Sequence, residues 1–240
     1  MSKQKRLDPR LVSLTAAGSF AAEQYQGLRL TLERLGNGRG AQALAVTSPA
    51  AGDGKTVTAI NLAGTLARGS EGRVLLIDAD LRRPAVSSQL ALDATAKGLT
   101  DALSDERTRL EDVTTTLEQF NLSIVPAGTG HGAVHQLLRS TRMERLLKEA
   151  RERYDFIVLD TPPLLPVFDS ALLAKWVDGV LMVVSANRTP RKLLGEALNL
   201  LDPGKVLGIV FNKDVRPLFG YYDSYYREYF PNASRVASEA

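Results

Sequence analysis

The residues of this chain best suited to chemistry are one lysine in a glycine-rich segment and three aspartates that end apolar runs. Residues 52–56 read GDGKT and lie between an apolar run and a helical pattern. Two glycines let backbone N–H groups curl around a phosphate, and the N-terminus of the following helix adds positive potential. Lys55 can then reach the β- and γ-phosphates of a nucleotide, and the Thr56 hydroxyl can bind Mg²⁺. The predicted phosphate-loop residues are Gly52, Asp53, Gly54, Lys55, Thr56 and Val57.

The three aspartates follow strongly apolar runs, Asp78 and Asp80 after VLLI and Asp160 after FIVL. Carboxylates beside a phosphate loop would repel a nucleotide unless a divalent cation lay between them, so they indicate Mg²⁺. We expect Asp160 to hold that cation through water. Asp78 and Asp80 share one side of an extended chain, so one can face the cation and the other a nucleophile. The alternative for each acid is a structural role, as a helix cap or as the partner of Arg82 or Arg83.

The elements that must position these residues follow a repeated strand and helix order. Apolar runs alternate with helical patterns, and they lie at 43–47, 73–78, 122–126, 155–160, 179–185 and 206–211. The runs VLLI and FIVL are apolar on both faces, as strands between two helix layers must be. The pattern predicts an α/β fold with a mostly parallel sheet covered by helices on both faces. Ligands of such sheets bind beyond the carboxyl ends of the strands, where all three motifs fall.

A break in the pattern at residues 36–38 marks the start of the core. A helical pattern from about Ser19 to Leu35 precedes this break, which reads GNG. We expect three parts: an N-terminal helical arm over 1–38 with an oligomerisation helix, a core over 39–216, and a tyrosine-rich tail over 217–240.

The composition fits one α/β domain and excludes several classes of protein. The chain has 240 residues, 44% hydrophobic and 24% charged, which is enough for one substantial core. It has no cysteine, so disulfide frameworks and thiolate metal sites are excluded. No run approaches the roughly 20 apolar residues of a membrane span, and a net charge of +3 gives no indication of nucleic-acid binding. We expect a cytoplasmic protein without a nucleic-acid partner.

Taken together, the motifs resemble those of the bacterial tyrosine kinases (BY-kinases) of capsule and exopolysaccharide synthesis. GDGKT is similar to the Walker A motif of that family, VLLIDADLRRP at 74–84 to Walker A′, and FIVLDTPP at 156–163 to Walker B. The similarity continues through 98–106, 121–128 and 206–213, so it covers nearly the whole chain. It implies a P-loop NTPase-like fold and an ATP- and Mg²⁺-dependent protein-tyrosine autokinase in its stand-alone cytoplasmic form.

The resemblance also implies roles for individual residues. The implied catalytic residues are Lys55, Asp78, Asp80 and Asp160, and the implied metal ligands are Thr56, Asp80 and Asp160. Asp78 or Asp80 would help to accept the tyrosine proton. Arg82 matches the arginine of the Walker A′ motif and is expected at the bound nucleotide. Asn212 matches the asparagine that contacts adenine in the family.

The chain departs from the family at the phosphate loop and in the N-terminal helix. Pro49 stands where the first glycine of G-x-x-x-x-G-K-[ST] would be, and Ala51 where the family usually has proline. We expect an altered loop shape that keeps its N–H donors. The oligomer-forming E-x-x-R-x-x-R segment reads Glu23, Gln26 and Arg29, so one charged contact of the expected ring is missing.

Five tyrosines cluster near the end of the chain, namely Tyr221, Tyr222, Tyr225, Tyr226 and Tyr229. Four of them have helical spacing, which by itself is typical of a packed face. BY-kinases end in a tyrosine cluster that a neighbouring subunit phosphorylates, so the resemblance implies that these five are phosphoacceptors. Each phosphate would add roughly −1.5 to −2 charges, which we expect to release the tail and to dissolve an oligomer.

The resemblance implies three kinds of partner. These are a separate membrane adaptor of the polysaccharide co-polymerase kind, further copies of the chain that phosphorylate one another, and a cognate tyrosine phosphatase. The kinase would then act at the inner face of the cell membrane.

Two alternatives to a kinase remain. One is an ATPase switch of the MinD and ParA type, although that class has a signature lysine where this chain has Ala50. The other is a catalytically inactive, ATP-binding scaffold whose aromatic tail binds a membrane partner.

Overall fold

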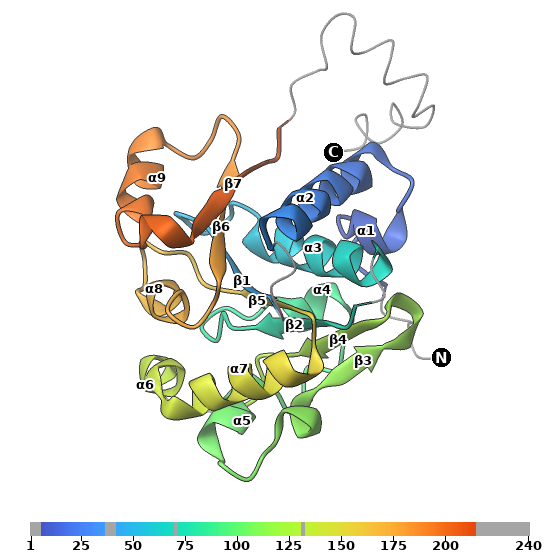
Figure 1. The fold of residues 1–240 in the computed structure, drawn as a ribbon, viewed down its shortest axis with the longest axis vertical. Coiled ribbons are helices and arrows are strands. Elements are labelled where there is room, and N and C mark those ends of the chain that lie inside the picture. Colours follow the sequence, from blue (N-terminus) through green and yellow to red (C-terminus); the bar gives the residue numbers. More distant parts are fainter. Residues whose placement is uncertain (1–5, 37–41, 70–71, 131–132, 215–240) are drawn as a thin grey trace, which may run out of the picture.

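The sheet that organises the molecule has seven strands in the order β3-β4-β2-β5-β1-β6-β7 (Figure 1). The computed structural model describes residues 6–36, 42–69, 72–130 and 133–214. All strands are parallel except β3, which runs antiparallel to β4. The strands are β1 Gln42–Thr47, β2 Val74–Asp78, β3 Thr115–Leu117, β4 Leu122–Val125, β5 Phe156–Asp160, β6 Gly179–Ser185 and β7 Val206–Asn212.

The six predicted strands and the mostly parallel sheet are confirmed, and β3 is an addition. β3 has only three residues and lies at the edge of the sheet, with its first two residues exposed. Such a short, half-exposed strand leaves no apolar run in the sequence, and its antiparallel pairing with β4 comes from the turn at 118–121.

Nine α-helices surround the sheet in the described part of the chain. They are α1 Val12–Thr15, α2 Phe20–Gly36, α3 Lys55–Gly69, α4 Val86–Gln89, α5 Leu99–Ser104, α6 Val134–Arg139, α7 Thr141–Arg153, α8 Asp169–Leu173 and α9 Arg191–Leu198. Short 3₁₀ turns occupy Leu110–Val113, Glu118–Phe120 and Pro203–Lys205. None of the helices in the described ranges combines the length and the hydropathy that crossing a bilayer requires.

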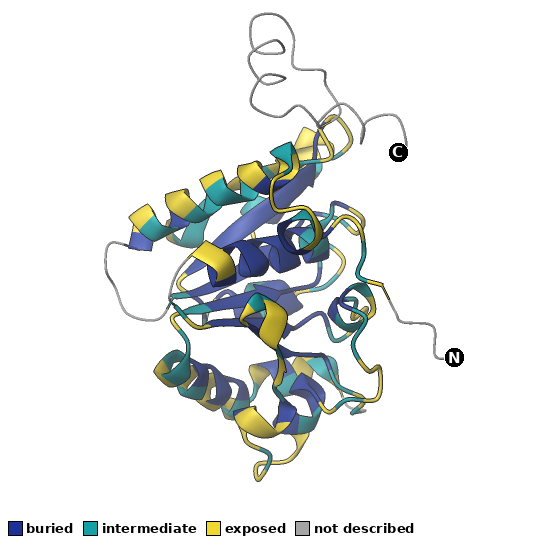
Figure 2. Ribbon diagram, turned by 90° about the vertical axis from the view of Figure 1, so that its right-hand side faces the viewer, coloured by how far each residue is buried: buried dark blue, intermediate teal, exposed yellow. Residues whose placement is uncertain are grey.

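The strands bury both faces, so the protein has one apolar core on each side of the sheet. In β2, Leu75 and Ile77 belong to the core formed with α5 to α9, while Val74 and Leu76 belong to the core formed with α1 to α4. This alternation follows from the two-residue repeat of a strand. Figure 2 shows the central strands and α3 as the most buried elements. The predicted two-sided helix cover is therefore present.

Helix α3 lies between the sheet and the N-terminal arm. All residues from 58 to 67 are buried. Asn61 accepts a hydrogen bond from the Ser13 N–H (2.9 Å) and donates one to the Arg10 carbonyl (3.0 Å). A Cβ on Gly64 would lie 2.6 Å from Leu14 Cδ2, so α1 approaches α3 too closely for a larger residue. The arm thus packs as an outer layer on α3, while the division of the chain at residues 38 and 216 stays a prediction.

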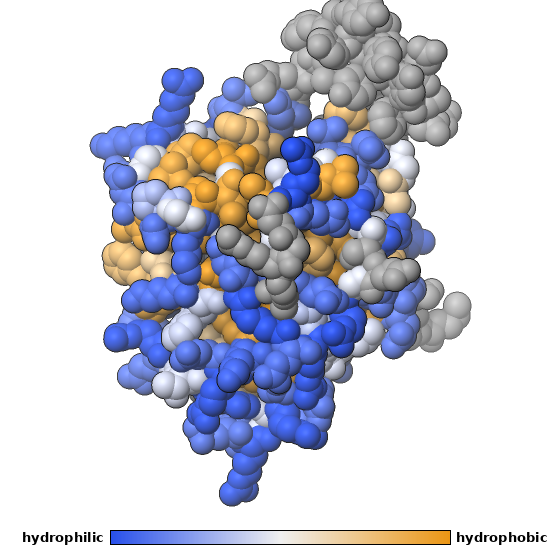
Figure 3. All heavy atoms as spheres, viewed as in Figure 1, coloured by the Kyte–Doolittle hydropathy of each residue, from blue (hydrophilic) through white to orange (hydrophobic). Residues whose placement is uncertain are grey.

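One face of the molecule exposes apolar side chains. Figure 3 shows them gathered in the upper half of the face that Figure 1 presents, where β7 and α2 lie. β7 is an edge strand of the sheet, and its Phe211 is 66% exposed. Leu30 on α2 is 52% exposed. Exposed apolar groups at a sheet edge are typical of a surface that meets another chain.

Candidate active site

The phosphate loop connects β1 to α3 and has the backbone that the sequence predicts. Gly52 and Gly54 have φ angles of +90° and +95°, which side chains rarely adopt. A Cβ on Gly54 would also lie 2.0 Å from Asn212 Nδ2. The loop therefore needs both glycines, and it leads directly into the N-terminus of α3 at Lys55.

The Asp53 side chain holds this loop in place. It is 6% exposed. Its Oδ1 accepts hydrogen bonds from Thr189 Oγ1 (2.6 Å) and the Ser185 N–H (3.3 Å), and its Oδ2 accepts one from the Ala50 N–H (3.4 Å). Phosphate binding by Asp53 would thus use its backbone N–H. Thr189 and Ser185 carried no signal in the sequence, because only the fold brings the end of β6 to the loop.

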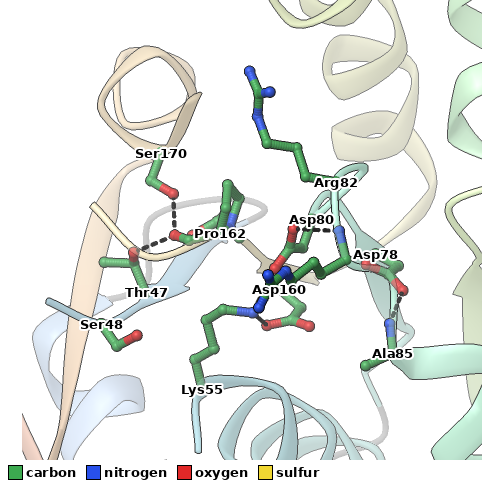
Figure 4. Close-up of polar contacts among 12 residues, drawn as sticks. Thr47, Ser48, Lys55, Asp78, Asp80, Arg82, Ala85, Asp160, Pro162 and Ser170 are labelled. Carbon is green, nitrogen blue, oxygen red and sulfur yellow. Dashed lines mark hydrogen bonds and ion pairs between the residues drawn. The ribbon is translucent and has the colours of Figure 1, made fainter. Parts of the chain in front are cut away.

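Lys55 joins two of the predicted carboxylates (Figure 4). Its Nζ lies 2.7 Å from Asp80 Oδ2 and 3.9 Å from Asp160 Oδ1. The second oxygen of Asp80 accepts the Arg83 N–H at 3.1 Å. The structure therefore brings the Lys55 ammonium group together with acids from the ends of β2 and β5, as the sequence predicts.

Asp160 is a buried acid whose oxygens lack hydrogen-bond partners. It has no exposed surface, and neither carboxylate oxygen has such a partner among the described residues. Burial raises its pKa to about 6, against the lowering effects of the Lys55 charge and of the neighbouring Thr56 hydroxyl, while the Asp80 charge raises it further. A buried carboxylate with an ammonium group at 3.9 Å and no hydrogen bond from the described residues is suited to a cation, directly or through water.

Asp78 pairs with Asp160 in the register of β2 and β5, so the two acids are neighbours. Its Oδ2 accepts the N–H groups of Ala85 (3.1 Å) and Val86 (3.0 Å) at the start of α4, whereas its Oδ1 has no partner among the described residues. Burial, and then the charge of Asp160, raise the pKa of Asp78 to about 7, against the lowering effect of the Val86 N–H. Asp78 thus has the structural capping role considered above, and its Oδ1 is buried without a hydrogen bond from the described residues.

The predicted magnesium ligands fit a cation that is also held by a nucleotide. Thr56 begins α3 beside Lys55, and Asp80 and Asp160 flank the lysine. In the described ranges no three His, Cys, Asp or Glu side chains come together to hold a metal by themselves. A cation here would therefore need phosphate oxygens or water, which is the usual mode for Mg²⁺.

Arg82 points away from Lys55 and the acids (Figure 4). Its Nε donates to Asp169 Oδ2 at 2.5 Å and its Nη2 to Asp169 Oδ1 at 3.3 Å. This bidentate pair raises the pKa of Arg82. The predicted nucleotide contact of Arg82 stays a prediction, and it would require the guanidinium to exchange Asp169 for phosphate. Asp169 was missed because an acid at the start of a helix has many possible uses.

Asn212 reaches the phosphate loop from the end of β7. Its Nδ2 donates to the Asp53 carbonyl at 2.9 Å and its Oδ1 accepts the Lys213 N–H at 2.9 Å. These contacts brace the loop, and the adenine contact of Asn212 stays a prediction.

Buried hydroxyls tie the Walker B segment to the end of β1 and to α8. Thr47 Oγ1 donates to the Pro162 carbonyl at 2.8 Å, and Ser170 Oγ donates to the same carbonyl (Figure 4). The Leu164 N–H donates to the Ser48 carbonyl at 2.8 Å. These bonds fix the ends of β1 and β5 relative to each other.

The remaining predicted residues lie elsewhere. All five tail tyrosines fall outside the described residues. Glu23, Gln26 and Arg29 lie on α2, where Arg29 Nη1 bonds Glu33 Oε1 at 3.2 Å. Ring assembly through this helix is not tested by these contacts.

Comparisons with known proteins identify the family of this chain. The AAA domain family matches residues 41–199. The tyrosine-protein kinase YwqD of Bacillus subtilis is 31% identical over 92% of this chain and 94% of its own length. The succinoglycan biosynthesis transport protein ExoP of Rhizobium meliloti is 34% identical over 88% of this chain, which spans 27% of that longer protein.

A solved structure gives the same result for the fold. The crystal structure of the VpsO kinase domain is 33% identical, covers 85% of this chain and 94% of its own, and superposes with a TM-score of 0.69. The phosphate loop, its lysine and the strand-end acids lie within the matched family region. The chain therefore belongs to the bacterial tyrosine-protein kinases.

Proposed function

We propose that this chain is an ATP- and Mg²⁺-dependent protein-tyrosine autokinase that serves the synthesis or export of capsule or exopolysaccharide. The observation that carries the proposal is the Lys55 ammonium, which lies at the phosphate loop 2.7 Å from Asp80 and 3.9 Å from Asp160. Membership of a kinase family favours transfer to tyrosine over an ATPase switch or an inactive scaffold.

The residues of this chain would act mainly by positioning and by neutralising charge. The N–H groups of residues 52–57 and the N-terminus of α3 would bind the phosphates of ATP. Lys55 would offset the charge of the transferred phosphoryl group, which dominates catalysis of this loose transition state. Thr56, Asp80 and Asp160 would hold Mg²⁺, which supplies further charge neutralisation when bound.

Asp78 is the better placed of the two acids that could accept the tyrosine proton. Both oxygens of Asp80 already accept hydrogen bonds, from Lys55 and from the Arg83 N–H. The Oδ1 of Asp78 accepts no hydrogen bond within the described part of the chain, and the Asp78 pKa of about 7 suits a base at neutral pH.

The acceptors that we propose are the tail tyrosines, Tyr221, Tyr222, Tyr225, Tyr226 and Tyr229. Five clustered hydroxyls at one end of the chain would be presented to a neighbouring copy, and a tyrosine phosphatase would reverse the reaction.

A membrane adaptor is the third partner that we propose. The support is the match to ExoP, a transport protein of which this chain covers only 27%. An adaptor would bring the kinase to the inner face of the membrane.

Labelling with γ-³²P-ATP and Mg²⁺ tests the proposal, with the purified chain alone and with membranes of its host that supply an adaptor. We expect phosphotyrosine on the wild type and none on Lys55→Met. Lys192→Met is the matched control, because that side chain is 87% exposed on α9. Wild-type protein that stays unlabelled under both conditions would contradict the proposal.

A further inference from the structure

Lys213 is an exposed lysine that the structure places against the phosphate loop. It follows Asn212 at the carboxyl end of β7. Its Nζ donates to the Gly52 carbonyl, and its Cε lies 3.9 Å from the position that a Cβ on Gly54 would take. The carbon stem of Lys213 therefore lies along the loop, and its charged end is tethered there.

The backbone of Lys213 adopts an unusual conformation to make this contact. Its φ is +58°, in the left-handed region that residues other than glycine seldom occupy. The Asn212 Oδ1 accepts the Lys213 N–H at 2.9 Å and thereby supports the turn. A strained residue that its neighbours hold so firmly is a reason to look for a function.

The sheet order says which end of a bound nucleotide would reach Lys213. Asp78 and Asp160 end β2 and β5, on one side of β1, and Asn212 ends β7, two strands away on the other side. The reacting γ-phosphate must lie with Lys55 and the acids. The nucleoside end then extends across the loop toward β6 and β7.

We propose that the stem of Lys213 forms one wall of the site for the nucleotide base, held in place by the bond to the Gly52 carbonyl. This inference rests on the proposed nucleotide site. The methylene groups of a lysine stem cover an aromatic ring well, and the ammonium adds attraction to its face. Lys213 would thus be a binding residue for the base, distinct from the bracing role of Asn212.

Lys213 is not needed for the shape of the phosphate loop itself. The Asp53 carboxylate bonds Thr189 Oγ1 at 2.6 Å, and the Asp53 carbonyl accepts the Asn212 Nδ2 at 2.9 Å. These ties remain when Lys213 is changed. Loss of the Lys213 stem should therefore weaken binding of the base and leave binding of the phosphates unchanged.

Calorimetric titration of the full chain with two probes tests this. The probes are the magnesium complexes of AMP-PNP, which has a base, and of inorganic tripolyphosphate, which has none. We expect Lys213→Ala to raise the Kd of AMP-PNP about tenfold, equal to about 1.4 kcal/mol, with the Kd of tripolyphosphate within about twofold of the wild type. Lys213→Arg, which keeps a long stem and N–H donors, should restore most of the AMP-PNP affinity.

Lys55→Met and Lys192→Ala are the controls. Lys55→Met should weaken both probes, and the exposed Lys192→Ala neither. Equal weakening of both probes by Lys213→Ala would mean that Lys213 only shapes the loop, and unchanged binding of both would mean that it has no role; either result overturns the inference. Failure of both probes to bind the wild type would instead contradict the proposed nucleotide site.

Discussion

Burial of the Asp160 carboxylate costs stability at neutral pH. Its pKa rises from 3.8 to about 6, first because of burial. Without metal and nucleotide, the folded protein binds a proton more tightly than the unfolded chain, so this contribution to stability is present below about pH 4. It is lost as the pH rises through about 6.

We therefore expect Asp160→Asn to stabilise the protein in EDTA at pH 8. Two pKa units correspond to about 2–3 kcal/mol, or a rise in Tm of about 4–12 °C for a chain of this size. At pH 4 the difference should vanish. Thermal unfolding at both pH values measures this, and a variant less stable than the wild type at pH 8 would contradict the account of Asp160.

Asp178 provides a control, because its pKa is shifted in the opposite direction to that of Asp160. Burial works against its charged form, but Arg151 and the Ala43 N–H outweigh burial and lower its pKa. Asp178→Asn should therefore destabilise the protein at pH 8, because it removes the negative charge that pairs with Arg151.

The unpaired oxygen of Asp78 leads to a second prediction. Asp78→Asn keeps an acceptor for the N–H groups of Ala85 and Val86 and removes the base. We expect tyrosine transfer to fall by roughly 10²–10⁴-fold, with ATP affinity little changed. Asp80→Asn, which loses the Lys55 ion pair, should change both. Single-turnover labelling and calorimetry separate the two effects. If Asp78→Asn transfers at the wild-type rate, Asp78 is not the base.

At the scale of single residues, the sequence predicted those features of the site that depend on the spacing of residues close together in the chain. A glycine-rich turn before a helix and acids at strand ends were sufficient to place Lys55, Asp80 and Asp160 together. The contacts of Asp53 and Lys213 could not be predicted, because they join segments more than 130 residues apart. Arg82 matched a motif, but its ion pair with Asp169 could not be predicted, because Asp169 lies 87 positions away in the sequence.

At the scale of elements, the phosphate loop is clamped by the ends of β6 and β7. Thr189 follows β6, donates to Asp53 Oδ1 at 2.6 Å and accepts the Ser185 N–H at 2.9 Å. Asn212 at the end of β7 holds the Asp53 carbonyl. The clamp fixes the loop before any ligand binds, which lowers the entropic cost of binding.

Thr189→Val should loosen this clamp. It leaves the buried Asp53 carboxylate without its closest donor, and hydrogen bonds to charged groups contribute about 1.5–3 kcal/mol. We expect a matching loss of unfolding free energy and weaker binding of ATP, both largely restored by Thr189→Ser. Denaturant unfolding and calorimetry measure these quantities. Full ATP affinity in Thr189→Val would show that the clamp does not shape the site.

The elements themselves were largely predictable. Strands buried on both faces give uninterrupted apolar runs, so all six were found, and α2 begins and ends within about one residue of its pattern. The packing of the arm was not foreseen. It depends on polar residues of α3, such as Asn61, whose partners Arg10 and Ser13 lie 51 and 48 positions away.

At the scale of the whole molecule, one surface and one sequence segment suit interactions with partners. The apolar groups on β7 and α2 offer a contact surface, and the tyrosine cluster offers a segment whose charge can change. Five phosphates would add roughly −8 to −10 charges, enough to oppose close approach of neighbouring copies. Assembly and phosphorylation should therefore exclude each other.

Replacing the five tail tyrosines by glutamate should mimic the phosphorylated state. We expect the all-Glu chain to sediment as a monomer at concentrations where the wild type and an all-Phe chain associate. The all-Phe chain separates the effect of charge from the loss of hydroxyl groups. Analytical ultracentrifugation decides this, and an all-Glu chain that assembles as well as the wild type would contradict charge-driven release.

The most direct test of the central claim is phosphotyrosine mapping by mass spectrometry on the chain isolated from its own host, beside Lys55→Met and the control Lys192→Met. An autokinase requires phosphate on residues 221–229 of the wild type and of Lys192→Met, and none on Lys55→Met. An unmodified tail in cells that are making the polymer, or phosphate that persists in Lys55→Met, would contradict it.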